Sequence, residues 1–139
     1  MGKGTVAVLL VALMGAGWLG WRQFGPQPPV VPGKPIVEVR LPVALTPEQE
    51  AGKAAYDANC AKCHGANGSG LEGKAPPFVH RIYEPSHHGD AAFFIAAQQG
   101  VRSHHWPYGN MPPVEGVSEA EVATIVAYIR AIQRANGVE

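Results

Sequence analysis

Two cysteines and a histidine form the most closely spaced group of reactive or metal-binding residues in the sequence. Cys60 and Cys63 are separated by two residues, His64 follows directly, and the sequence contains no other cysteine. This spacing is the attachment signature of a c-type haem, in which each thiol adds across one vinyl group and the imidazole binds the iron. We therefore expect one haem c, covalently held through Cys60 and Cys63, with His64 as the proximal ligand.

Other uses of paired cysteines agree less well with the sequence. A zinc finger would need two further ligands, and His80, His87 and His88 do not follow Cys63 at the usual finger spacing. A thioredoxin-like dithiol would need a βαβ setting, which the flanking residues do not offer. Haem attachment is the better interpretation of the motif.

A helix is expected to lead directly into the cysteine motif. Thr46 as N-cap, Pro47 at the first helical position and Gln49 three residues after the cap are typical of a helix start. The helix should run to about Ala58. It would therefore deliver the two cysteines at its carboxyl end.

Two more helices are expected downstream. One should begin with Asp90 as its N-cap and end near Gln99, with Gly100 as the stop. The other opens with Ser118 in a capping-box pattern and continues to about Ala135, with apolar residues repeating every three and four positions. Abundant glycine and proline suit irregular loops around a cofactor better than a packed sheet, so we expect an all-α fold.

The first 45 residues differ in character from the rest. The apolar run at residues 5–21 carries Trp18 and Trp21 at its carboxyl end, where an interfacial aromatic belt would fall, which favours an uncleaved membrane anchor over a cleaved signal peptide. Residues 25–45 contain six prolines and are expected as an extended linker without packed contacts. The predicted division is therefore an anchor or signal segment (1–24), a Pro-rich linker (25–45) and a globular domain (46–139).

The order of these features over residues 46–139 resembles the class I, mono-haem c-type cytochromes of bacteria. The first helix runs into the cysteine motif, a Met-Pro pair follows in a loop at 111–112, and an amphipathic helix closes the chain. The resemblance implies a cytochrome c fold, with helices wrapped around one haem and the first and last helices crossing closely. Gly52 and Tyr56 match the small residue and the aromatic at that crossing. Their candidate partners are Ile125, Tyr128 and Ile129.

The sixth iron ligand is implied by chemistry and resemblance together. Met111 is the only methionine of the predicted domain, and a thioether stabilises ferrous iron relative to a second imidazole. His104 and His105 are the rivals, and either would make a bis-histidine cytochrome of lower potential. These two histidines, like His80, His87 and His88, are otherwise expected as loop or surface residues. A histidine-rich metal site is the alternative.

The resemblance also implies a hydrogen bond that orients the proximal histidine. Residues 75–78 resemble the family segment in which a proline carbonyl accepts this bond, with Pro76 aligned to that proline and Pro77 as the alternative. The haem propionates need partners as well. Residues of suitable type are Arg81, Arg102, Trp106 and Tyr108.

The function implied is one-electron transfer rather than catalysis. Equal numbers of acidic and basic residues give no signal for nucleic acid. We expect a carrier tethered on the periplasmic side of the bacterial inner membrane, with redox proteins of the periplasm or membrane as partners. The alternatives are a cytochrome subunit of a larger respiratory or dehydrogenase complex and, in a different class, a haem sensor or peroxidase-like enzyme.

Overall fold

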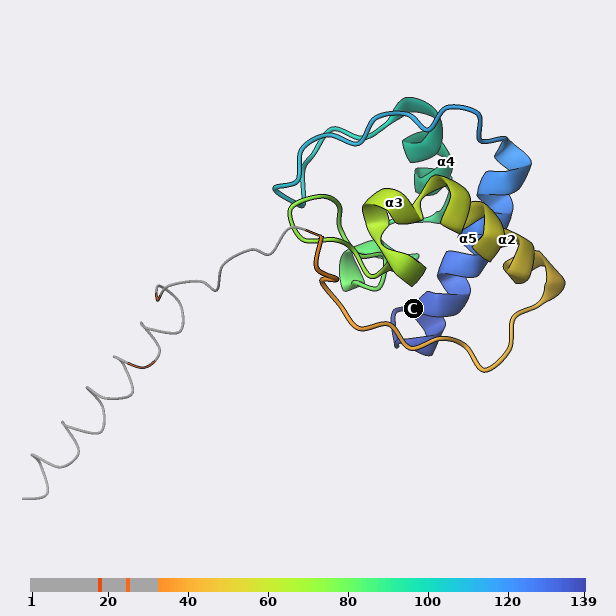
Figure 1. Ribbon diagram of the computed structural model, residues 1–139, viewed down its shortest axis with the longest axis horizontal. Helices are drawn as coiled ribbons and strands as arrows, with labels where there is room; N and C mark the ends of the chain where they lie inside the picture. Colours follow the sequence, from red (N-terminus) through yellow and green to blue (C-terminus); the bar gives the residue numbers. More distant parts are fainter. Residues whose placement is uncertain (1–17, 19–24, 26–32) are drawn as a thin grey trace, which may run out of the picture.

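The computed structural model describes Trp18, Gly25 and residues 33–139. Within this part of the chain, strand pairing is limited to isolated bridges, and the architecture is all-α as expected. Figure 1 shows the helices gathered into one rounded body. They are α2 (Pro47–Asn59), α3 (Ala61–His64), the short 3₁₀ helices η1 (Ala66–Gly68) and η2 (Arg81–Tyr83), α4 (Asp90–Gln99) and α5 (Glu119–Ala135).

Capping boxes start both long helices, as predicted. In α2 the Thr46 hydroxyl accepts from the Gln49 N–H, and the Gln49 side chain accepts from the Thr46 N–H. The prediction for α4 was wrong by one residue, because its N-cap is Gly89 and Asp90 is the first helical residue. The Asp90 carboxylate accepts a hydrogen bond from Arg130 at 2.8 Å instead of capping the helix.

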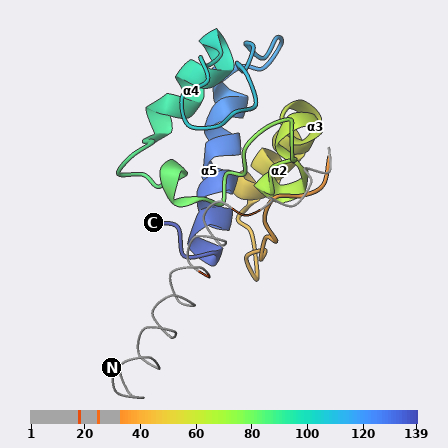
Figure 2. The ribbon, with the colours of Figure 1, turned by 90° about the vertical axis from the view of Figure 1, so that its left-hand side faces the viewer.

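The core lies where α2 crosses α5. Figure 2 shows α5 running through the middle of the domain, with α2 and α3 on one side and α4 on the other. Gly52 permits the close crossing, since a Cβ there would lie 1.9 Å from the carbonyl oxygen of Thr124. The rings of Tyr56 and Tyr128, both fully buried, lie 5.8 Å apart. Tyr128 was one of the expected partners, and Ile125 and Ile129 belong to the same buried cluster.

Residues 33–45 lie against the domain, which differs from the expectation of a linker without packed contacts. The Ile36 and Val37 N–H groups both donate to the carbonyl of Ser69, and the side chain of Asn136 bonds the backbone of Arg40 in both directions. Val39 and Leu45 pack against the core cluster. Backbone hydrogen bonds and a few partly buried apolar side chains therefore hold this stretch on the domain.

The predicted anchor at residues 5–21 lies, apart from Trp18, outside the described residues. Among the residues that are described, no helix has both the length and the apolar character needed to cross a bilayer.

Candidate functional site

The two cysteines and the histidine share one face of a single helical turn. The Cys63 and His64 N–H groups both donate to the carbonyl of Cys60, at 3.1 and 2.9 Å. Residues three and four apart are neighbours on a helix surface, so this turn presents both thiols and the imidazole together. Both cysteines are free thiols, and burial followed by the influence of Cys63 raises the pKa of Cys60 to about 11. The site thus offers two free thiols beside one imidazole.

The His64 ring is buried and held by a single backbone contact. Its Nδ1 lies 2.9 Å from the carbonyl oxygen of Pro76. A carbonyl only accepts, so Nδ1 carries the proton and Nε2 keeps its lone pair. Burial lowers the pKa of His64, although the bond to Pro76 acts in the opposite direction. The ring is therefore neutral near neutral pH, the form in which imidazole binds a metal. Of the two prolines in this segment, Pro76 provides the carbonyl.

Phe78 links the histidine to the rest of the aromatic core. Its ring stacks on His64 with centroids 4.4 Å apart and meets Tyr56 edge-on at 6.3 Å. Tyr83 and Phe93 each lie 5.6 Å from it. The Phe78 ring thus covers one side of the imidazole.

The backbone of Met111 is attached to the end of α4. Met111 and Val101 exchange two N–H···O hydrogen bonds, both 2.9 Å long. Gly100 makes this approach possible, because its φ is +75° and a Cβ there would lie 2.4 Å from the Met111 carbonyl oxygen. The loop from Val101 to Met111 is therefore closed at its base, and the methionine sits at a defined position beside α4.

Trp106 carries a buried donor near the same region. Its Nε1 is buried and has no hydrogen-bond partner among the described residues. Burial raises the pKa of Tyr83 to about 12, and the nearby Trp106 acts in the opposite direction. The contact between these two side chains falls short of hydrogen-bond geometry. Tyr108 stacks on Trp106 at 5.8 Å. The indole N–H is thus available to an acceptor such as a haem propionate.

The residues present are suited to a haem. Helix α4, with the sequence DAAFFIAAQQ, is rich in apolar residues, yet none of its residues is buried. Ile95 is 53% exposed, and Phe93 and Phe94 are only partly covered. A large apolar group such as a haem would cover these partly exposed side chains. The two thiols could form the thioether bonds of a c-type haem, and the neutral imidazole could bind its iron. The indole N–H of Trp106 could donate a hydrogen bond to one of its propionates.

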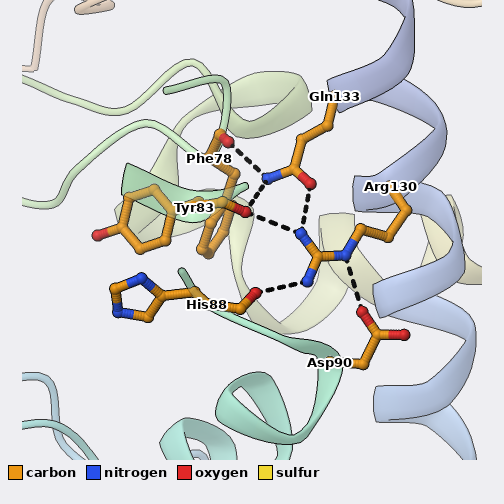
Figure 3. Close-up of polar contacts among 6 residues, drawn as sticks. All are labelled: Phe78, Tyr83, His88, Asp90, Arg130 and Gln133. Atoms are coloured by element: carbon orange, nitrogen blue, oxygen red, sulfur yellow. Dashed lines mark hydrogen bonds and ion pairs between the residues drawn. The ribbon is translucent and has the colours of Figure 1, made fainter. Parts of the chain in front are cut away.

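Sequence reasoning missed two polar residues of α5 that hold the loop before α4. Arg130 donates to the backbone carbonyls of Tyr83 and His88, and Gln133 donates to those of Phe78 and Tyr83 (Figure 3). Both side chains are buried, at 8% and 1% exposed. The available signal was their position, since each lies beside residues of the apolar stripe of α5 rather than on its solvent face.

The protein-family model described as Cytochrome c matches residues 49–133, which is more than half of the chain. The matched range includes both cysteines, His64 and Met111. Neither the curated proteins nor the solved structures contained a match to the sequence.

Proposed function

Because the chain belongs to the cytochrome c family, a family of haem-based electron carriers, we propose that it carries single electrons on one haem c. Cys60 and Cys63 would hold this haem by thioether bonds, with His64 and Met111 as the axial ligands. When bound, the haem supplies a reversible ferric–ferrous couple. The protein's residues then hold the iron ligands and set the polarity around them.

The observation that carries the proposal is the state of His64. Its ring is neutral, buried and oriented by Pro76, while the two thiols lie on the same helical turn. A hydrogen bond from the ring nitrogen that does not bind the metal to a carbonyl fixes the orientation of a ligating histidine and increases its basicity. Electron transfer needs no catalytic side chain. With both axial positions filled, the iron would have no open site for a substrate.

The case for Met111 as the sixth ligand combines its chemistry with its attachment. Its backbone is held by two hydrogen bonds to Val101. Both rival histidines are exposed, whereas Met111 is partly buried, and His105 Nε2 lies 3.4 Å from His87 Nε2. These observations favour the methionine, and a thioether ligand predicts a positive potential.

The proposed location is the periplasmic side of the bacterial inner membrane, with the apolar run at 5–21 as a tether. The haem-attachment motif supports an exported location, because c-type haem is attached outside the cytoplasm. The apolar composition of residues 5–21 supports the tether. Redox proteins of the periplasm or membrane are the proposed partners. Separating the membranes of an expressing cell from its soluble extract tests the tether: the full chain should stay with the membranes until detergent is added.

The decisive experiment is a potentiometric titration with optical spectra on the haem-loaded wild type and on Met111→Ala. The variant should lose the charge-transfer absorption of thioether-ligated ferric haem, and its potential should fall by roughly 0.1 V or more, within the ~0.8 V range over which axial ligands act. His105→Gln is the matched control and should keep the wild-type spectrum and potential.

The opposite pattern would overturn the ligand assignment. A wild-type spectrum in Met111→Ala together with a changed spectrum in His104→Gln or His105→Gln would establish histidine ligation. Tight carbon monoxide binding by the native ferrous protein would show an open or labile position on the iron, which belongs to a sensor or peroxidase-like enzyme and not to a carrier.

A further inference from the structure

Four histidines from two separate loops meet on the surface of the domain. His87 and His88 precede α4, while His104 and His105 follow it. Nε2 of His87 lies 3.4 Å from Nε2 of His105, and one ring nitrogen from each of His87, His88 and His105 lies within 4.8 Å of the others. Folding therefore assembles a group of potential ligands that lie about 18 positions apart along the chain.

The ring of His88 is oriented in the way a metal ligand usually is. Its Nδ1 lies 2.6 Å from the carbonyl oxygen of Ile82, so Nδ1 carries the proton and Nε2 is left with its lone pair. The ring is partly buried against Tyr83, 5.2 Å away. Arg130 holds the backbone carbonyl of His88 at 2.6 Å, and Figure 3 shows the imidazole directed away from that contact. One of the three ligands is thus fixed before any ion arrives.

The spacing corresponds to a transition metal. Two nitrogens bound to one ion at about 2.0–2.1 Å in a tetrahedral arrangement lie about 3.3 Å apart. The His87–His105 pair already has this separation, and the third nitrogen, which lies within 4.8 Å of the other two, must move closer to complete the set. A set made only of imidazoles suits Zn²⁺ and Cu²⁺ and does not suit Ca²⁺ or Mg²⁺, which take oxygen ligands.

We propose that His87, His88 and His105 form a second metal site, which binds one Zn²⁺ or Cu²⁺ ion and leaves a fourth position to solvent. Three imidazoles with an open position is an arrangement that catalytic zinc sites also use. His104 is excluded from the set, because it is not among the three mutually close ligands. The site is separate from the proposed haem ligands His64 and Met111, and it requires that His105 is not the sixth ligand.

The test uses the untagged, haem-loaded protein after dialysis against a chelator. Calorimetric titration with Zn²⁺ and with Cu²⁺ should each give one saturable site, with Cu²⁺ bound more tightly. Electron paramagnetic resonance of the Cu²⁺ form should show splitting from nitrogen ligands. His87→Gln and His105→Gln should each weaken binding at least about tenfold. The adjacent His104→Gln is the matched control and should stay within about twofold of wild type.

Several results would overturn this site. They are the absence of one-to-one binding in the wild type, an equal loss of affinity in His104→Gln and His105→Gln, and an unchanged affinity in His105→Gln. The haem spectrum and the circular dichroism of each variant are recorded on the same samples. A variant that keeps both but loses the metal has lost the site and not the fold, and failure of the haem proposal would show in the haem spectrum instead.

Discussion

Gly52 shows how strictly a single residue can be determined by packing. A side chain at this position would meet the Thr124 carbonyl carbon at 2.5 Å and the Tyr128 Cβ at 3.0 Å, as well as the carbonyl oxygen. The obstacle is mostly backbone, which cannot rotate out of the way. Intrinsic helix propensity favours alanine over glycine by about 1 kcal/mol in a helix interior. At this crossing the two effects oppose each other, and the clash is the larger one.

We therefore expect Gly52→Ala to destabilise the protein despite its better helix propensity. The free energy of unfolding should fall by about 2 kcal/mol, since overpacking at a close contact exceeds the propensity gain. Denaturant unfolding of the haem-loaded protein measures it. Ala54→Gly, at an exposed position of the same helix, calibrates the propensity effect and should cost about 1 kcal/mol. An alanine at 52 that stabilises the protein would show that the helices do not cross this closely.

At the scale of one element, the start of α5 depends on a charged capping box. The Glu121 carboxylate accepts from the N–H and the hydroxyl of Ser118, at 2.9 and 2.7 Å, and the Ser118 hydroxyl accepts from the Glu121 N–H. These hydrogen bonds favour the ionised carboxylate and lower the pKa of Glu121. The folded-state pKa lies below the unfolded one, so this stabilisation is complete above the unfolded value of about 4.3 and is lost as the pH falls through the folded value.

The pH dependence gives a test of this cap. At pH 6 the wild type should melt a few degrees higher than Glu121→Gln, which keeps a capping side chain but removes its charge. The difference should disappear as the pH falls below about 4. Thermal melts of the haem-loaded protein followed by far-ultraviolet circular dichroism provide the measurement. Glu115→Gln, which lies before the helix, should show no such pH-dependent gap. A gap that persists at low pH would mean that the charge of Glu121 is not its source.

At the scale of the whole molecule, Arg130 and Gln133 join α5 to the loop that carries Phe78 and the first two surface histidines. Arg130 also forms an ion pair with Asp90 at the start of α4 and lies over the ring of Phe93, 5.0 Å from its centroid. One buried side chain therefore connects α4, α5 and the loop between η2 and α4. The positions of His64's neighbour Phe78 and of the proposed metal ligand His88 both depend on this connection.

Removing the guanidinium should loosen all three parts at once. Arg130→Leu leaves the His88 carbonyl without this donor, and the free energy of unfolding should fall by about 2–4 kcal/mol. Arg134→Leu, one turn further along α5 and exposed, should change it by less than about 0.5 kcal/mol. Denaturant titration of both variants measures the contrast. Equal small effects would mean that the loop is held by Gln133 and by apolar packing alone.

Local signals explain which parts of the fold were predictable. The two capping boxes, the glycine stop at Gly100 and the apolar stripe of α5 depend on neighbours a few residues away, so the helix ends were predicted to within about one residue. The error at α4 has a tertiary cause, because the Asp90 carboxylate is engaged by Arg130 from a distant helix. Residues 33–45 were misjudged for the same reason: their hydrogen-bond partners lie at residues 69–72 and at 136.

The sequence by itself placed two thiols and one imidazole within five residues, directly after a predicted helix. It also identified the methionine and the histidines as candidate ligands, and Pro76 and Pro77 as candidate acceptors for the hydrogen bond from His64. The structure shows that the thiols and the imidazole share one helical turn. Only the tertiary structure decided that the Pro76 carbonyl meets the His64 ring and that the two histidine pairs converge on one spot. Those contacts join residues 12 to 18 positions apart through loops, whose paths follow from the packing of the whole domain and not from local propensity.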